Sequence, residues 1–304
     1  MLRVRFLSAL VLIPLVLVAV GLGGVWLALL VALAVGLALT ELFQLFAAAG
    51  YRPVRWAGFT SALFLFLAVF LAHDTTGLPF CLSPGVATPG FLFPYDRLLG
   101  SALAGTVLLT LTAQLLRRDR GGALTDWALT LAGPLYVTWP LLHFLLLRRL
   151  AQPEISPPFW RALRGPALGA GAWWILYTLV LVWMCDTAAY FVGIRWGRHR
   201  MSPYVSPKKS WEGAAAGLLT SIALAVGLVP VLGLPLPYGL AALLGALVGT
   251  VGQVGDLAES LLKRQAGVKD SGRLIPGHGG MLDRVDSLLF VAPAVYYFLQ
   301  WTLR

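Results

Sequence analysis

Long apolar runs recur along almost the whole chain, and they constrain its fold more than any other feature. A run of about 20 apolar residues is what an α-helix needs to cross the hydrocarbon core of a bilayer. Hydrophobic residues make up 59% of the sequence and charged residues 12%, against about 25% charged in typical soluble domains. We therefore expect an all-α polytopic membrane protein with about nine transmembrane helices. They are predicted near residues 6–22, 24–48, 56–73, 98–116, 125–147, 171–193, 213–233, 236–256 and 287–303.

The basic residues between these runs predict the orientation. With the N-terminus in the cytoplasm, the cytoplasmic segments hold 17 of the 23 Lys and Arg residues, as the positive-inside rule requires. The segment 148–170 is the exception, with four arginines on the predicted outer side. Either it lies in the interface or the count of spans before it is wrong by one. In both cases the loops 194–212 and 257–286 share one face, because two spans separate them.

The formal charge of +10 fits the same interpretation. Its Lys and Arg residues sit in short loops that anchor orientation, and the sequence shows no basic, aromatic-interleaved domain that would bind nucleic acid. The expected partner is the lipid bilayer, and the expected location is the cell inner membrane as a multi-pass protein.

Groups able to do chemistry concentrate in the second half of the chain. Seven of the 13 acidic residues and all four lysines fall between positions 186 and 286. We therefore divide the chain into a membrane scaffold at 1–170, with about five helices, and a catalytic membrane domain at 171–304, with about four. Glu41, inside the second run, is expected near a helix end rather than in catalysis.

The end of the eighth run carries a polar face. Asp256, Glu259, Ser260 and Lys263 are spaced i, i+3, i+4 and i+7, so a helix places them on one side. The alternative is a solvated helix end with an i,i+4 Glu–Lys pair. Asp256 weakens that alternative, because a carboxylate at the edge of a span is costly without a partner or a metal ion.

A glycine-rich basic loop follows. In such loops backbone N–H groups and cations can approach phosphate closely, although glycine-rich loops also serve as turns. His278 has no second histidine nearby, so zinc is not expected, and a phosphate contact or a structural hydrogen bond are equally open. The candidate residues of this loop are Lys269, Asp270, Arg273, His278, Gly279 and Gly280.

Two carboxylates open the last apolar run. Asp283 and Asp286 are three residues apart, so they share a helical face. Together with Asp256 they predict a Mg²⁺ site, because Mg²⁺ binds through one or two carboxylates plus substrate phosphates. The alternative for Asp283 is capping of the helix N-terminus.

The earlier loop supplies a second cluster. Lys208 and Lys209, flanked by Ser206 and Ser210, form a candidate phosphate-binding turn, although membrane anchoring explains the lysines alone. Asp186, inside a span, and Glu212, after the turn, are weaker candidates, as are Glu259 and Asp270.

The stretch SLLKRQAGVKDSGRLIPGHGGMLDRVD, residues 260–286, resembles the hallmark motif of the phosphatidate cytidylyltransferases. The stretch from Asp186 to Glu212 is similar to that family's other characteristic loop. Residues 1–170 resemble the family only as hydrophobic spans. The resemblance implies the reaction CTP + phosphatidate → CDP-diacylglycerol + diphosphate, in phospholipid biosynthesis, with both substrates reaching a cytoplasmic active site.

The resemblance also implies roles for the candidates. Asp256, Asp283 and Asp286 would hold Mg²⁺, with K⁺ as a possible second cation. Lys263, Arg264, Lys269 and Arg284 would contact phosphate, opposite Ser206, Lys208, Lys209 and Ser210, with Arg273, His278, Gly279 and Gly280 in the loop between. Lys263 joins the three aspartates as a catalytic residue. The family further implies a homodimer.

Two other readings compete. Another membrane enzyme that uses CTP, such as a polyisoprenol kinase or an ether-lipid cytidylyltransferase, would share much of the pattern. A secondary transporter would place ionisable residues near the membrane midplane in both halves of the chain. Here they gather in two loops of one half, which disfavours transport.

Overall fold

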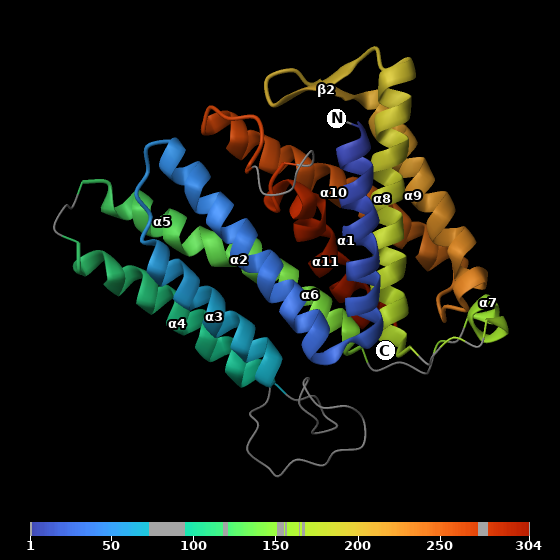
Figure 1. Ribbon diagram of the computed structural model, residues 1–304, viewed down its shortest axis with the longest axis horizontal. Coiled ribbons are helices and arrows are strands. Elements are labelled where there is room, and N and C mark those ends of the chain that lie inside the picture. Colours follow the sequence, from blue (N-terminus) through green and yellow to red (C-terminus); the bar gives the residue numbers. More distant parts are fainter. Residues whose placement is uncertain are drawn as a thin grey trace, which may run out of the picture. The chain divides into compact units, whose positions relative to one another are not determined.

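The computed structural model describes residues 2–72, 95–117, 121–150, 155, 157–163, 165, 168–272 and 279–303, with side chains from residue 10 onward. Helices dominate the described residues (Figure 1). They are α1 (Leu2–Leu22), α2 (Gly24–Ala48), α3 (Arg55–Leu71), α4 (Tyr95–Leu115), α5 (Ala123–Gly133), α6 (Trp139–Arg148), α7 (Pro158–Ala162), α8 (Ala170–Trp196), α9 (Trp211–Leu232), α10 (Tyr238–Gln265) and α11 (Leu282–Thr302). A π-helical turn, η1 (Pro134–Thr138), joins α5 to α6, and the strands are β1 (Arg200–Ser202) and β2 (Ser206–Ser210).

Each predicted apolar run coincides with a helix or, for 125–147, with the α5–η1–α6 succession. Within the described residues, six helical segments are long and apolar enough to cross a membrane. They are Gly24–Ala48, Tyr95–Leu115, Ala123–Arg148, Ala170–Trp196, Trp211–Leu232 and Tyr238–Gln265. The polytopic helical architecture is thus confirmed, and the chain is a multi-pass membrane protein.

Of the three other predicted spans, those in α3 and α11 fall short of that standard, and the one in α1 is described with side chains only in part. The part of α1 whose side chains are described, Leu10–Leu22, is apolar. The α3 helix is 17 residues long. The α11 helix has 21 residues, but Asp283, Arg284 and Asp286 open it and lower its hydropathy. Nine spans is therefore more than the described helices support by length and composition.

The chain folds into two compact units, which are described separately. The first comprises Met1–Leu146 and Gln265–Val285, and the second comprises Leu147–Arg264 and Asp286–Arg304. The functional division at residue 170, made from the placement of charged residues, stays a prediction. The glycine-rich segment from the end of α10 to the first residue of α11, described at residues 266–272 and 279–282 and called the motif loop below, belongs to the first unit, together with the N-terminal helices.

In the first unit, α2, α3, α4 and α5 pack side by side (Figure 1). The fully buried ring of Phe43 on α2 fits against two glycines. A Cβ atom would lie 2.3 Å from the ring at Gly58 on α3, and 2.8 Å from it at Gly133 on α5. Only glycine lets these helices approach so closely.

The second unit is organised around α8 and α9, which pack along one another. Small residues permit this approach, as expected for membrane helices. A Cβ atom at Gly213 would lie 2.6 Å from the backbone oxygen of Ala189, and one at Gly217 would lie 2.9 Å from that of Cys185. On α10, Gly245 meets the backbone of α9 in the same way at 2.7 Å.

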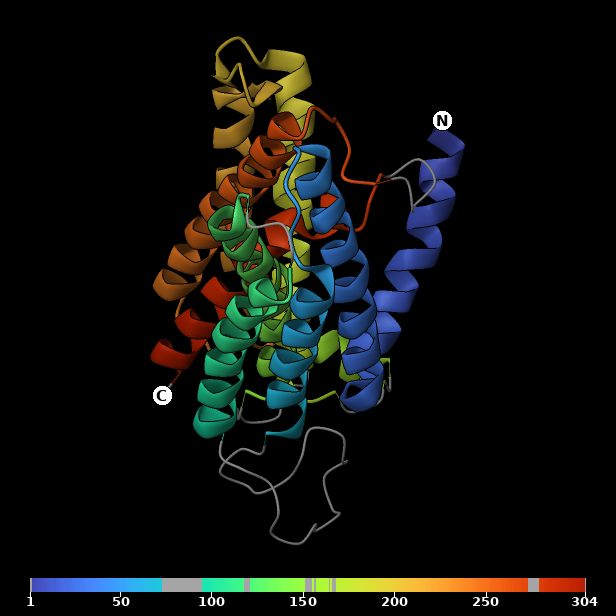
Figure 2. The same cartoon turned by 90° about the vertical axis from the view of Figure 1, so that its left-hand side faces the viewer.

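The segment predicted as the loop 194–212 contains a short antiparallel hairpin. Arg200 pairs with Ser210 and Ser202 pairs with Ser206, so β1 and β2 form a two-stranded sheet. Figure 2 shows this hairpin, in yellow, at the ends of α8 and α9. The all-α prediction is correct for the membrane body and wrong for this segment, where strand pairing satisfies the backbone N–H and C=O groups.

Candidate active site

Charged side chains from four elements meet in the second unit. Asp186 comes from α8, Lys209 from β2, Asp256 and Lys263 from α10, and Asp286 from α11. Each of the other acidic groups, and Lys263, acts electrostatically on the Asp286 carboxyl. The structure therefore brings together candidate residues from three predicted segments of this unit. They are the turn with Lys209, the end of the eighth apolar run with Asp256 and Lys263, and the start of the ninth with Asp286.

An ion pair joins the hairpin to α10. The Lys209 Nζ atom lies 2.6 Å from Asp256 Oδ2, and both side chains are partly exposed. The Ser260 hydroxyl is 3.4 Å from the other carboxylate oxygen of Asp256. Asp256 therefore has the partner that a carboxylate at the edge of a span requires.

The helices α10 and α11 cross at Gly255, directly beside Asp256. A Cβ atom at Gly255 would lie 2.7 Å from the backbone oxygen of Asp286. Asp286 lies in the first turn of α11, ahead of the apolar run that starts at Ser287. Burial, and then the negative charge of Asp256, raise the pKa of Asp286 to about 7. Two carboxylates that repel one another in this way are suited to share a cation.

Glu259 and Lys263 form the i,i+4 pair that the sequence offers, with Lys263 Nζ 2.5 Å from Glu259 Oε2. Glu259 is fully buried, so this end of α10 is not a solvated surface. Next along the helix, Arg264 Nε donates to the backbone oxygen of Val205, 3.1 Å away. Arg264 thus ties α10 to the turn of the hairpin.

The residues of β2 divide between two tasks. Ser210 caps α9, because its hydroxyl accepts a hydrogen bond from the Gly213 N–H at 3.2 Å. Lys208 is exposed, while Lys209 is partly buried against Asp256. Neighbouring strand residues point to opposite sides, so of the two lysines Lys209 belongs to the charged cluster.

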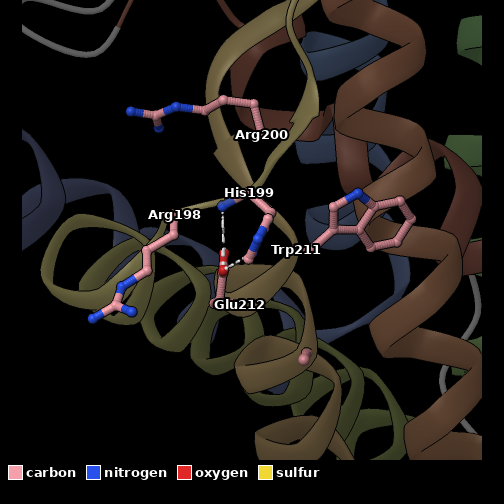
Figure 3. Close-up of a pocket in the computed structure, with 6 residues that line it drawn as sticks. Arg198, His199, Arg200, Trp211 and Glu212 are labelled. Atoms are coloured by element: carbon pink, nitrogen blue, oxygen red, sulfur yellow. Dashed lines mark hydrogen bonds and ion pairs between the residues drawn. The ribbon is translucent and has the colours of Figure 1, made fainter.

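Glu212 lies in a different place. Its carboxylate accepts from the His199 N–H, and its Oε1 is 2.6 Å from His199 Nδ1. Figure 3 shows this pair, with the guanidinium groups of Arg198 and Arg200 pointing away from it. The hollow here has a volume of about 890 Å³, and its lining residues are Arg198, His199, Arg200, Trp211, Glu212 and Ala215. Among the described residues that line it, none belongs to the charged cluster.

The motif loop in the first unit is organised by Asp283. Its Oδ2 accepts hydrogen bonds from the Ser271 N–H at 3.0 Å, the Ser271 hydroxyl at 3.0 Å and the Gly280 N–H at 2.9 Å. Gly279 adopts a left-handed φ of +81°, which favours glycine. Asp283 therefore holds the loop at the start of α11. It is the second residue of that helix and accepts from N–H groups that precede it, so it is not the N-cap that the alternative predicted.

The other candidates of this loop are more exposed or are not described. The side chains of Lys269, Asp270 and Arg284 are exposed. Arg273 and His278 lie outside the described residues. Among the residues that are described, no group of three or more His, Cys, Asp or Glu side chains is arranged to hold a metal ion. The predicted use of Asp283 as a third Mg²⁺ ligand stays a prediction.

Sequence reasoning missed the importance of Glu41. Its side chain on α2 is buried, and it accepts hydrogen bonds from Ser271, Met281 and Leu282. The signal was available, because Glu41 is the only acidic residue among the first 73 and lies inside an apolar run. Ionisable residues in such runs are costly, and they commonly mark functional sites.

Fold and site together define a class: a multi-pass helical membrane protein whose lysines and carboxylates cluster where helices end. Comparison with known proteins gives the family. The Cytidylyltransferase family model matches residues 3–302, and the chain belongs to that family.

Individual relatives agree with this assignment. The chain is similar to a phosphatidate cytidylyltransferase of Synechocystis, with 35% identity over 97% of this chain and 95% of the relative. It is 46% identical to the phosphatidate cytidylyltransferase of Bacillus subtilis over 42% of this chain, and that match spans about half of the relative (48%). It also resembles an uncharacterized Escherichia coli protein, YnbB, at 37% identity over 67% of this chain and 63% of the relative.

Proposed function

We propose that the protein is a phosphatidate cytidylyltransferase, which converts CTP and phosphatidate to CDP-diacylglycerol and diphosphate. The observation that carries the proposal is the Lys209–Asp256 pair beside Asp286, in a membrane chain of the Cytidylyltransferase family. A full-length relative bears the name of this activity.

The donors of the second unit fit a Mg²⁺ ion. Asp256 and Asp286 offer carboxylate oxygens, and burial, followed by the negative charge of Asp256, raises the pKa of Asp286. Mg²⁺ commonly uses one or two carboxylates and completes its coordination with water and substrate phosphates. We assign Asp256 and Asp286 as its ligands, and Asp283, one turn earlier on α11, as a third. When bound, Mg²⁺ supplies positive charge to the triphosphate. K⁺ is the proposed second cation.

The lysines supply the remaining charge. Lys209 and Lys263 are each held by a carboxylate, Asp256 and Glu259 respectively, so both ammonium groups are positioned before any substrate arrives. Nucleotidyl transfer depends mainly on positioning and on stabilising negative charge. Preorganised cations at the edge of the membrane suit a phosphate that arrives on a lipid.

The proposed reaction is a displacement at the α-phosphorus of CTP. A phosphate oxygen of phosphatidate forms the new P–O bond, the bond to the β-phosphate breaks, and diphosphate leaves. Phosphatidate is already anionic at neutral pH, so no strong general base is needed. Lys208, Arg264, Lys269, Arg273, His278, Gly279, Gly280 and Arg284 are proposed as further phosphate contacts.

The setting of the reaction is part of the proposal. The active site is assigned to the cytoplasmic face, where CTP is available, of an inner membrane protein, and the functional unit is assigned as a homodimer. A polyisoprenol kinase or an ether-lipid cytidylyltransferase is the alternative within CTP chemistry. Membership of the Cytidylyltransferase family favours transfer of a cytidylyl group over transport.

An acceptor comparison tests the proposal. Detergent-purified protein receives α-labelled CTP and Mg²⁺ with phosphatidate, a polyisoprenol or an ether-linked phosphatidate analogue in separate reactions. We expect labelled lipid with phosphatidate and none without an acceptor. Labelling confined to the polyisoprenol or the ether lipid would overturn the proposed substrate.

A further inference from the structure

Glu41 is a buried carboxylate in an otherwise apolar membrane helix. The 25 residues of α2 contain no other charged side chain, and Glu41 is 6% exposed. Taking a carboxylate out of water is unfavourable unless hydrogen bonds compensate for the lost hydration. The hydrogen-bond partners of Glu41 therefore indicate which segment its carboxylate stabilises.

All three recorded partners of Glu41 belong to the motif loop. Oε1 accepts from the Met281 N–H at 2.9 Å, and Oε2 accepts from the Leu282 N–H at 2.8 Å and from the Ser271 hydroxyl at 2.9 Å. Leu282 is the first residue of α11, so its N–H is one of the donors that a helix leaves without an internal partner. Glu41 thus satisfies the beginning of α11 from a helix about 240 positions earlier.

Ser271 connects Glu41 to Asp283. The Ser271 hydroxyl is 2.9 Å from Glu41 Oε2 and 3.0 Å from Asp283 Oδ2. It also accepts from the Asp283 N–H at 3.3 Å. The hydroxyl has one proton, which the two carboxylate oxygens share, so displacement of Glu41 would be felt at Asp283 through a single side chain.

Two described glycines of the loop, Gly272 and Gly280, lie against Glu41 without spare room. A Cβ atom at Gly280 would lie 2.2 Å from Glu41 Oε2, and one at Gly272 would lie 2.6 Å from Glu41 Oε1. The two glycines let the loop backbone approach the carboxylate from both sides. This close fit fixes the position of the loop relative to α2.

We propose that Glu41 is a positioning residue for the active site: it holds the motif loop and the start of α11, and through Ser271 it orients Asp283. The inference rests on the proposed function for its effect on turnover. Glu41 reaches the reaction through Ser271 and Asp283 and is not itself a catalytic residue.

The site favours a carboxylate because each oxygen of Glu41 faces a backbone N–H, Met281 at Oε1 and Leu282 at Oε2, and an N–H group can only donate. A glutamine of the same size would keep one acceptor oxygen and replace the other with an NH₂ group. That group would face the Leu282 N–H and the Ser271 hydroxyl, or else the Met281 N–H. A buried donor facing another donor loses a hydrogen bond and keeps its desolvation cost.

The test compares Glu41→Gln with a matched control, Asp126→Asn. Asp126 is also buried in the first unit, where it accepts from the Arg52 N–H and pairs with Arg117. Its recorded contacts do not involve residues 271–272 or 279–285. Two quantities are measured for each variant in detergent: hydrogen exchange of the amides of residues 279–285, and kcat and KM for CTP.

We expect Glu41→Gln to accelerate amide exchange at Met281 and Leu282 by about tenfold, as for one lost buried hydrogen bond. We also expect kcat to fall at least about tenfold with little change in KM, since orientation rather than ground-state binding is lost. Asp126→Asn should leave loop exchange and kcat unchanged. Ser271→Ala provides a second variant that keeps Glu41 and removes only the link to Asp283.

If the amides of Met281 and Leu282 exchanged in Glu41→Gln at the same rate as in the wild-type protein, Glu41 would not hold the loop and the proposal would be overturned. Faster exchange with a wild-type kcat, or equal effects of Asp126→Asn, would overturn the positioning role. Absence of CDP-diacylglycerol formation by the wild-type protein would refute the proposed function instead. The exchange measurement would still decide whether Glu41 holds the loop.

Discussion

Two carboxylates of each unit, Asp256 and Glu259 in the second and Glu41 and Asp283 in the first, are held in opposite ways. In the second unit, Asp256 and Glu259 pair with the ammonium groups of Lys209 and Lys263. In the first unit, Glu41 and Asp283 accept from backbone N–H groups and from the Ser271 hydroxyl. The first arrangement pairs opposite charges of side chains, whereas the second fixes the course of the backbone.

The difference indicates a division of labour. An ammonium group paired at the edge of a membrane helix can exchange its carboxylate for a substrate phosphate, because both partners are ions of similar strength. Glu41 has no such exchange open to it without loss of the loop conformation, because both of its carboxylate oxygens accept from N–H groups of residues 281 and 282. We therefore propose that the second unit stabilises the negative charge of the substrates. Glu41, Ser271 and Asp283 position the loop.

The largest effect should come from Asp286→Asn. It removes a proposed Mg²⁺ ligand and a like-charge repulsion with Asp256, so turnover should fall about 1,000-fold while the protein is no less stable than the wild type. Steady-state transfer rates and thermal unfolding in EDTA measure the two quantities. If the variant lost stability in parallel with activity, Asp286 would be a residue that stabilises the fold and not a Mg²⁺ ligand.

Asp283→Asn should also nearly abolish turnover while folding and membrane insertion stay intact. Unlike Asp286→Asn, it should lower the unfolding temperature, because Oδ2 accepts three hydrogen bonds from the loop and a neutral amide oxygen is a weaker acceptor than a carboxylate oxygen. The comparison of unfolding temperatures for the two variants is the measurement. Ample activity in Asp283→Asn would contradict the assignment of Asp283 as a Mg²⁺ ligand.

A smaller loss is expected for Gly255→Ala, which tests the crossing of α10 and α11. The added methyl would lie 2.7 Å from the Asp286 backbone oxygen, and a shift of about 1 Å in a reacting group costs about 100-fold in rate. Gly239→Ala, also on α10 but with nothing within 4 Å, is the matched control and should keep wild-type turnover. Equal rates for the two variants would show that the crossing does not position Asp286.

The smallest effect should come from Ser271→Ala, with about a tenfold fall in kcat, at the low end for groups that orient a metal ligand. It removes one hydroxyl and leaves the backbone bonds of Glu41 and Asp283 in place. Combined with Glu41→Gln, its effect should be less than additive, because both variants break the same link. Strict additivity in the double-mutant cycle would mean that Glu41 and Asp283 act separately.

The sequence predicted the membrane body well because the physical constraint is strong. Apolar runs of membrane length leave few choices besides helices, and the predicted run 24–48 coincides with α2. The hairpin was missed because β1 has three residues and β2 has five. Runs this short carry too little alternation to be recognised as strands.

The site was predictable where neighbours in sequence act together. Helical spacing placed Glu259 and Lys263 on one side, and the structure pairs them. It could not show that Glu259 is buried, or that Glu41 contacts residues beyond position 270. Such contacts depend on tertiary packing, which a local pattern does not encode.

One measurement tests the central claim most directly, which is that the charged cluster serves attack at the α-phosphorus of CTP. Wild-type protein and Asp286→Asn are incubated with phosphatidate and with CTP labelled either at the α- or at the γ-phosphate. Our account predicts that wild-type protein puts the α-label into lipid and the γ-label into diphosphate, and that Asp286→Asn does neither. γ-Label in the lipid would instead show a kinase and contradict the account.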